Sequence, residues 1–214
     1  RGFDLDAIRA DFPILSREVH GKPLVYLDSA ASAQKPAQVL DALMSAYQDT
    51  YANVHRGLHF LSEASTDLYE AVRGKVAGFI GAASGDEIVL TSGATMSLNL
   101  IARCWAQPRL QPGDEILISI AEHHANIVPW QMVAEATGAR VRAFTLEDDG
   151  AFSMARLKAE MSERTRIISV PHVSNVLGTV FPVAEIAELA HDAGALMVVD
   201  GCQGVVHMPV DVTA

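Results

Sequence analysis

The sequence predicts an α/β protein built around a mainly parallel β-sheet. Short apolar runs, typical of strands that are buried on both faces, alternate along the chain with longer segments of helical period. The chain has 214 residues, of which 50% are hydrophobic, enough for one large globular domain. Parallel strands need crossover connections, so this alternation favours a parallel sheet covered by helices.

Two helices are expected ahead of the first strand. Residues 39–51 and residues 68–80 both repeat apolar side chains at helical spacing. The apolar face of the first helix would contain Val39, Leu40, Leu43, Met44 and Tyr47, and that of the second would contain Leu68, Val72, Val76, Phe79 and Ile80.

Short apolar runs then indicate the strands, which we expect at residues 87–91, 114–120, 139–144, 166–170 and 195–200. A helix is expected after the first run, over residues 96–105. Another should lie between the last two runs, where Pro182 can open a helix and Gly194 can close it.

Composition and charge exclude several classes of function. The net charge is −10, without any tract rich in Lys or Arg, so nucleic acid is not an expected partner. Apolar runs stay far below the ~20 residues of a membrane span, and the charged N-terminus does not resemble a signal peptide. Cys104 and Cys202 have neither a disulfide pattern nor a metal-ligand spacing. We therefore expect a cytoplasmic protein with no metal site.

Polar residues gather where the expected strands end. In open α/β sheets, ligands bind beyond the carboxyl ends of the strands, so these residues should converge. They are the turn Ser92–Thr95, then His123, His124 and Asn126, then His172, Ser174 and Asn175, and finally Asp200 and Gln203.

Each of these groups also has a simpler interpretation. The Ser92–Thr95 turn could seat a phosphate at a helix N-terminus or could only cap the helix. On a strand, the adjacent His123 and His124 would point in opposite directions, which argues against a two-histidine metal site. Asn175 could form a turn and Asp200 a cap. Taken together, the groups favour one composite site.

The combination narrows the chemistry of that site. A phosphate seat, an aromatic ring that can stack and a buried carboxylate are what pyridoxal phosphate (PLP) requires. A carboxylate such as Asp200, beside the pyridine nitrogen, would keep that nitrogen protonated and able to draw electrons.

The sequence resembles a known family, the Suf-type (group II) cysteine desulfurases. These are class V, fold-type I PLP enzymes, with selenocysteine lyases as close relatives. The resemblance covers essentially the whole chain. It is carried by the segments Tyr26–Pro36, Asn53–Gly57, Ala121–Gln131, His172–Thr179 and Val199–Val212.

The resemblance implies a role for each matching position around PLP. His123 would stack on the pyridine ring and act as an acid or base. Asp200 would pair with the ring nitrogen, and Gln203 would bind the phenolic oxygen. Thr95 and the backbone at Ala94 would hold the phosphate. The substrate side would be formed by Asn175, which also lies near the cofactor, and by Ala30, Ala31, His55 and Arg56.

Departures from the family pattern occur at two places. Ser92–Met96 reads Ser-Gly-Ala-Thr-Met, where the family usually has Arg-Gly-Thr-Thr-Glu. The missing hydroxyl could weaken phosphate binding by roughly 1.5–3 kcal/mol. Cys202 stands where the family usually has Ala, so we expect it to be a small buried residue rather than the nucleophile. Cys104 is likewise expected in the core.

The family's cofactor-bearing lysine and its nucleophilic cysteine both follow the last matching segment. The four lysines of this sequence are Lys22, Lys35, Lys75 and Lys158, and none ends an expected strand. The strand at residues 87–91 would also lack its family neighbour. We therefore expect the N-terminal portion of a longer enzyme. Residues 1–20 would form an arm that joins a small domain, and residues 21–214 would begin the large PLP-binding domain.

The implied activity is the removal of sulfur from L-cysteine, giving L-alanine and an enzyme persulfide for iron–sulfur cluster assembly. The expected partners are L-cysteine or L-selenocysteine, a sulfur-acceptor protein and a second copy of the protein in a homodimer. Two alternatives remain open. One is a selenocysteine lyase or another class V enzyme, and the other is a non-catalytic paralogue that binds a partner. Ser92, Ala94 and Met96 favour the second alternative, whereas the presence of His123, Asn175, Asp200 and Gln203 speaks against it.

Overall fold

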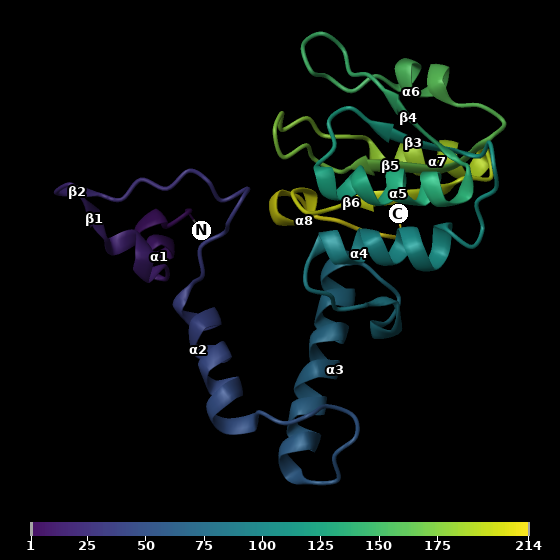
Figure 1. Ribbon diagram of the computed structural model, residues 1–214. Coiled ribbons are helices and arrows are strands. Elements are labelled where there is room, and N and C mark those ends of the chain that lie inside the picture. Colours follow the sequence, from purple (N-terminus) through teal and green to yellow (C-terminus); the bar gives the residue numbers. More distant parts are fainter. Residues whose placement is uncertain (1, 214) are drawn as a thin grey trace. The chain divides into compact units, whose positions relative to one another are not determined.

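The computed structural model of the protein describes residues 2–213 (Figure 1). The chain divides into two compact units, Arg1–Lys75 and Val76–Ala214, each of which is described by itself. The division expected near residue 20 stays a prediction. Among the described residues, none of the helices has the length and apolar character needed to cross a membrane.

The first unit begins with α1 (Leu5–Ala10), whose N-cap Asp4 accepts the N–H of Ala7 at 3.0 Å. A short turn, η1 (Pro13–Ser16), leads to an antiparallel hairpin of β1 (Glu18–Val19) and β2 (Lys22–Pro23). His20 and Gly21 join these strands with φ angles of 54° and 72°. Such a left-handed pair matches the twist of a two-residue hairpin.

Both helices expected in this part of the chain are confirmed. The first is α2 (Ala37–Ser45), which continues into the π-helical turn η2 (Ala46–Thr50). The second is α3 (Phe60–Ile80), which begins in the first unit and ends in the second. The expected apolar stripe, which runs from α2 into η2, is exposed, by 42% at Leu40 in α2 and 64% at Tyr47 in η2. The other described residues of the first unit therefore do not cover this stripe.

The second unit contains a sheet of four parallel strands in the order β4-β3-β5-β6. This confirms the predicted fold class. The strands are β3 (Glu115–Ser119), β4 (Arg140–Phe144), β5 (Thr165–Pro171) and β6 (Leu196–Asp200), close to the expected runs. The central β3 and β5 are almost completely buried, as their continuous apolar sequences predict.

Helices cover both faces of this sheet and enclose two hydrophobic cores. Ile116 and Ile118 of β3 pack with α4 (Ala94–Leu100), its π-helical extension η4 (Ile101–Ala106) and α5 (Val128–Thr137). Leu117 points to the other face, toward α6 (Met154–Glu160) and α7 (Val183–Asp192). The two-residue period of a strand thus divides the apolar residues between two layers of helices.

The prediction of a strand at residues 87–91 is wrong. Gly85–Glu87 forms a short 3₁₀ turn, η3, and Ile88 follows it with extended backbone angles, φ −102° and ψ 119°. Residues 89–91 join no sheet among residues 2–213, and Val89 is 74% exposed. Strand formation needs a neighbouring strand as well as an apolar sequence, because the backbone groups of a strand form their hydrogen bonds with the adjacent strand.

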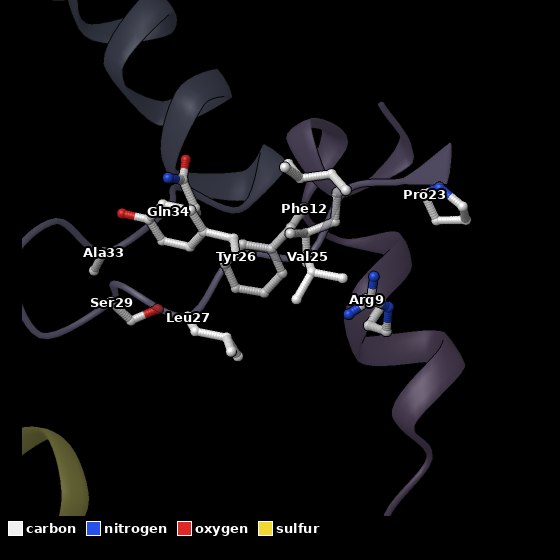
Figure 2. Close-up of a pocket in the computed structure, with 11 residues that line it drawn as sticks. Arg9, Phe12, Pro23, Val25, Tyr26, Leu27, Ser29, Ala33 and Gln34 are labelled. Atoms are coloured by element: carbon white, nitrogen blue, oxygen red, sulfur yellow. The ribbon is translucent and has the colours of Figure 1, made fainter. Parts of the chain in front are cut away.

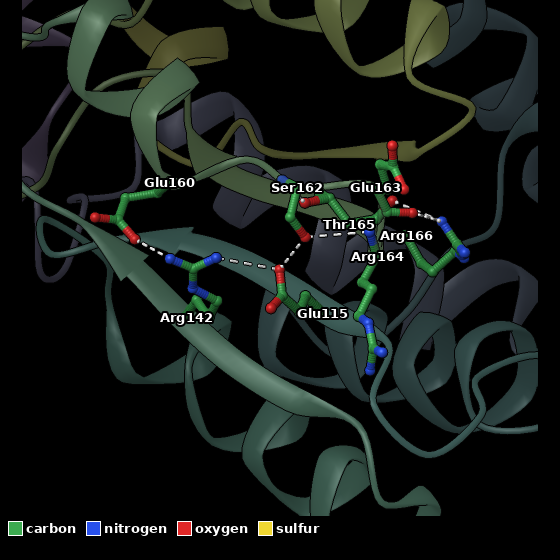
Figure 3. A network of polar contacts seen from close by, with 8 residues as sticks. All are labelled: Glu115, Arg142, Glu160, Ser162, Glu163, Arg164, Thr165 and Arg166. Atoms are coloured by element: carbon green, nitrogen blue, oxygen red, sulfur yellow. Dashed lines mark hydrogen bonds and ion pairs between the residues drawn. The ribbon is translucent and has the colours of Figure 1, made fainter.

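The amino ends of β3 and β4 are tied by a polar network (Figure 3). Arg142 of β4 lies 3.2 Å from Glu115 of β3 and 2.5 Å from Glu160 at the end of α6. The hydroxyl of Ser162 donates to the same Glu115 oxygen at 2.6 Å. This hydrogen bond, aided by Arg142, lowers the pKa of Glu115. The network fixes the end of the sheet opposite to the expected site.

Candidate active site

The strand order has a switch point between β3 and β5. The chain leaves β3 through α5 to reach β4 on one side, and returns through α6 to β5 on the other side of β3. Helices α5 and α6 pack on opposite faces of the sheet. In open α/β sheets with such a switch point, ligands bind outside the carboxyl ends of the strands.

Hydrogen bonds connect the three strand ends that carry the expected site residues. The N–H of His172, after β5, donates to the carbonyl oxygen of Asp200 in β6 at 2.9 Å. The hydroxyl of Ser174 donates to the carbonyl oxygen of Ala121, after β3, at 3.3 Å. The structure thus brings together the segments that contain His123, Asn175 and Asp200.

His123 lies at the start of a short turn, η5 (His124–Asn126), where its side chain caps the backbone. Its Nδ1 atom accepts the N–H of Ala125 at 3.1 Å. A backbone N–H can only donate, so the neutral ring must carry its proton on Nε2. The imidazole of His123 is exposed, and its ring is nearly perpendicular to that of His124.

Ala94 and Thr95 begin α4, directly after Gly93. Gly93 has a φ of 112°, which glycine adopts easily, and a Cβ at this position would meet nothing within 4 Å. The first hydrogen bonds to the Gly93 carbonyl come from Met96 and Ser97. The N–H groups of Ala94 and Thr95 precede these bonds and can face an anion. Helix α4 packs against η5, next to His123.

The departure at Ser92 and Met96 forms a contact of its own. The hydroxyl of Ser92 lies 3.2 Å from the sulfur of Met96. This neutral hydroxyl–thioether contact lies beside the open turn at Gly93.

Asp200 is the last residue of β6 and is partly exposed rather than deeply buried. Strand β6 lies at an edge of the described sheet, which explains the difference from the expected burial. One oxygen of Asp200 accepts the N–H of Cys202 at 3.0 Å, and the carboxylate also interacts with the Cys202 thiol. Gln203 follows, partly buried, at the N-cap of α8 (Gly204–His207).

Asn175 lies on an exposed turn in the loop after β5. An isolated bridge between Val173 and Val180 closes this loop, and the N–H of Ser174 donates to the carbonyl of Thr179 at 3.0 Å. Ser174 also contacts the loop after β3, as described above. The loop therefore holds Asn175 beyond the end of β5.

Ala30 and Ala31 belong to the first unit, in a turn where the N–H groups of Ala31 and Ser32 donate to the carbonyl of Asp28. Both alanines are exposed. A cavity of about 510 Å³ lies beside this segment, between α1 and residues 23–34 (Figure 2). Its lining includes Tyr26, whose hydroxyl lies 2.5 Å from the carbonyl of Ser32 and braces the turn.

His55 and Arg56 also belong to the first unit, and both are exposed. His55 has a φ of 68°, a left-handed conformation that is uncommon outside glycine. The ring Nε2 of His55 lies 2.8 Å from a carboxylate oxygen of Glu70, and the backbone N–H of His55 donates to the hydroxyl of Thr66 at 2.9 Å. The bond to His55, with help from Arg73, lowers the pKa of Glu70. These contacts hold the strained backbone in place.

Both cysteines are exposed, so their expected burial is wrong. In η4 the buried residues are Ala102 and Ala106, and Cys104 lies on the opposite side of the turn. Partial burial of the Cys202 thiol, with the negative charge of Asp200, raises its pKa to about 11. Cys202 is therefore a protonated thiol at neutral pH and a weak nucleophile.

The sequence reasoning missed Glu122, which directly precedes His123. Burial raises the pKa of its carboxyl to about 8, and the negative charge of Asp200 acts in the same direction. The signal was present in the sequence, because a carboxylate next to a candidate catalytic histidine at a strand end is an unusual choice.

The parallel sheet, its switch point and the polar strand ends are features of α/β folds that bind ligands at the carboxyl ends of their strands. The family model described as Aminotransferase class-V matches residues 25–214, and the chain belongs to this family.

Two relatives and two solved structures that are similar to this chain are named cysteine desulfurases. A cysteine desulfurase of Dickeya dadantii is 53% identical over 99% of this chain, and one of Escherichia coli K12 is 51% identical. The solved cysteine desulfurase CsdA of Escherichia coli has a TM-score of 0.85 and 42% identity over the whole chain. The apo cysteine desulfurase of Thermococcus onnurineus has a TM-score of 0.90 and 34% identity. The chain spans about half of each of these proteins, between 51% and 52%.

Proposed function

We propose that this chain forms the N-terminal half of a PLP-dependent cysteine desulfurase. The complete enzyme would cleave the carbon–sulfur bond of L-cysteine, release L-alanine and pass the sulfur to an enzyme cysteine as a persulfide. The observation that carries the proposal is the convergence of the β3, β5 and β6 ends beside the N-terminus of α4. Relatives at 51–53% identity that are named cysteine desulfurases support it.

The donor set at the strand ends fits PLP. The start of α4 offers the N–H groups of Ala94 and Thr95, and the open space at Gly93 leaves room for a phosphate. Asp200 brings a carboxylate to the end of β6, where it would face a positively charged ring nitrogen. His123 offers an exposed imidazole to a planar ring. When bound, PLP supplies the electron sink that the cleavage of L-cysteine requires.

The side chains of this chain would then have separate tasks. The negative charge of Asp200 would keep the pyridine nitrogen protonated. His123 would stack on the ring and could donate its Nε2 proton, because Nδ1 is occupied by Ala125. Gln203 would bind the phenolic oxygen, and Asn175 would lie near the cofactor and the substrate carboxylate.

The first unit would complete the substrate side of the site. Ala30 and Ala31 would border the substrate, with His55 and Arg56 nearby. The braced turn at Asp28 and the strained backbone of His55 support this proposal, because strained residues collect at functional sites.

The wider setting of the enzyme is also part of this proposal. We propose a cytoplasmic homodimer that hands sulfur to an acceptor protein for iron–sulfur cluster assembly. The exposed apolar stripe of α2 supports a partner-covered surface in the complete protein.

The test is turnover by the full-length protein. The protein is purified with PLP and a reductant, and L-alanine and sulfide are measured with L-cysteine or L-selenocysteine as substrate. We expect equal amounts of L-alanine and sulfide from L-cysteine. Turnover of L-selenocysteine alone would make the protein a selenocysteine lyase. No turnover and no PLP binding would contradict the proposal and favour the partner-binding paralogue.

A further inference from the structure

Glu122 has both carboxylate oxygens in contact with buried polar groups. Oε1 lies 3.0 Å from the hydroxyl of Ser119, the last residue of β3. Oε2 accepts the amide Nδ2 of Asn126 at 2.8 Å. Ser119 is 1% exposed and Asn126 is fully buried. The side chain therefore joins the end of β3 to the last residue of η5, across the turn that contains His123.

The orientation of the Asn126 amide is fixed by its other neighbours. Its Oδ1 lies 2.9 Å from the indole Nε1 of Trp130 and 2.6 Å from the hydroxyl of Ser169. An indole N–H can only donate, so this atom must be the amide oxygen and Nδ2 must face Glu122. Trp130 and Ser169 are both fully buried, in α5 and β5. Helix α5 and strand β5 thus hold the amide of Asn126 in the orientation in which it donates to Glu122.

Backbone bonds complete the turn between these two anchors. The hydroxyl of Ser119 accepts the N–H of Ala121 at 3.1 Å. The N–H of Asn126 donates to the carbonyl of His123 at 2.8 Å. His123 therefore lies between two residues that Glu122 holds, and the same turn gives its Nδ1 the N–H of Ala125.

We propose that Glu122 is a positioning residue of this site, which holds the turn carrying His123 through Ser119 and Asn126. The proposal rests on the proposed function for the part that His123 plays toward PLP. The placement of the turn itself depends only on the contacts described here.

The surroundings of Glu122 disfavour the ionised form of its carboxyl group. Burial and the negative charge of Asp200 both disfavour an ionised Glu122. An uncharged carboxyl reduces this conflict, and its oxygens can still accept the hydrogen bonds from Ser119 and Asn126. Glu122 would then leave Asp200 as the negative charge that faces the ring nitrogen.

The experiment compares Glu122→Gln and Glu122→Ala in the full-length protein, with Glu135→Ala as the control. Glu135 is an exposed residue of α5. Histidine is labelled with ¹⁵N, and the signals of His123 are identified by their loss in His123→Gln. The ring nitrogen shifts of the PLP-free protein are measured at a pH where a free imidazole is neutral. Turnover of L-cysteine is measured in parallel with bound PLP.

Glu122→Ala should free the turn, so the Nδ1 and Nε2 signals of His123 should move toward each other as both tautomers become populated. Its kcat should fall on the order of 10²-fold, with a smaller change in KM. Glu122→Gln keeps an acceptor and a donor at the same place and should behave like the wild type. General destabilisation would not change the tautomer of the folded protein.

Unchanged His123 signals in Glu122→Ala would overturn the proposal, as would equal loss of turnover in both variants. If Glu122→Ala does not yield folded protein, Ser119→Ala removes one of the two anchors, and unchanged His123 signals there would overturn it as well. A wild type without turnover would contradict the proposed function, whereas the ¹⁵N shifts would still decide the role of Glu122.

Discussion

The imidazole ring of His172 lies directly against the α-carbon of Gly204. A Cβ at position 204 would lie 2.5 Å from Nδ1 of His172 and 2.8 Å from its Cβ, closer than real atoms approach. The backbone of His172 is fixed at the same time by its hydrogen bond to Asp200. The end of β5 therefore sets the position where α8 begins, one residue after Gln203.

Gly204→Ala should consequently force the His172 ring or the start of α8 to move. We expect a loss of about 1–3 kcal/mol in the free energy of unfolding, together with weaker PLP binding through the displaced Gln203. Gly201→Ala is the matched control, since a Cβ there meets nothing within 4 Å. Denaturant titration and PLP titration of the full-length protein measure both effects. Equal behaviour of the two variants would show that His172 gives way without cost.

The raised pKa of Glu122 should make stability depend on pH. Between its ordinary value of 4.5 and about 8, the folded protein holds a proton on this carboxyl that the unfolded chain has lost. The contribution of Glu122 to stability must therefore fall as pH rises through this range, by up to about 1.4 kcal/mol per unit. Glu122→Gln should flatten the profile, and Glu135→Gln should not. A wild-type profile that matches Glu122→Gln at every pH would disprove the raised pKa.

Cys202→Ala should leave persulfide formation and turnover of the full-length protein nearly unchanged. The thiol has a pKa of about 11 and is therefore protonated at neutral pH. Persulfide formation can be followed by mass spectrometry after reaction with L-cysteine. Loss of the persulfide in this variant would identify Cys202 as the nucleophile.

Asp200→Ala should abolish turnover of L-cysteine and leave the fold intact. The side chain of Asp200 interacts with the neighbouring Cys202 in the turn after β6 and lies outside the hydrogen bonds between the strands, so its removal disturbs little of the sheet. Circular dichroism reports the fold, and L-alanine release reports turnover. Asp192→Ala, at the exposed end of α7, serves as the control. Full turnover by Asp200→Ala would remove the basis for its proposed role.

Arg142→Met should weaken the amino end of the sheet slightly, because it removes the partly exposed ion pairs with Glu115 and Glu160. The lowered pKa of Glu115 stabilises the fold above its ordinary value, and this contribution is lost as pH falls. The variant should therefore lose more stability at pH 7 than at pH 3. Thermal unfolding at the two values measures the difference, with the exposed Arg103→Met as control. An equal loss at both pH values would exclude the electrostatic origin.

The sequence was sufficient to predict the strands of the sheet, because the apolar runs of β3, β5 and β6 end where a polar site begins. It was not sufficient for residues 88–91, whose apolar character resembles that of β3, because strand formation also depends on a partner strand. The predicted burial of Cys104 was wrong for a different reason. A π-helical turn changes which residues of a helix face the core, and single-sequence periodicity assumes a regular helix.

The site residues that lie at strand ends were predictable from position, since parallel strands deliver their carboxyl ends to one edge. Glu122 was not predicted, although its position beside His123 was a signal in the sequence, because its contacts with Ser119 and Asn126 are visible only in the folded turn. His55 and Ala30 belong to a different unit, and their roles stay predictions.

The strand order also bears on how the protein is made. Strand β3 emerges from the ribosome first, then β4 and β5 add to its two sides, and β6 adds last beside β5. Each strand finds its neighbour already synthesised, and the helix that covers it lies in the intervening sequence. The sheet can therefore grow vectorially during translation, from its centre outward.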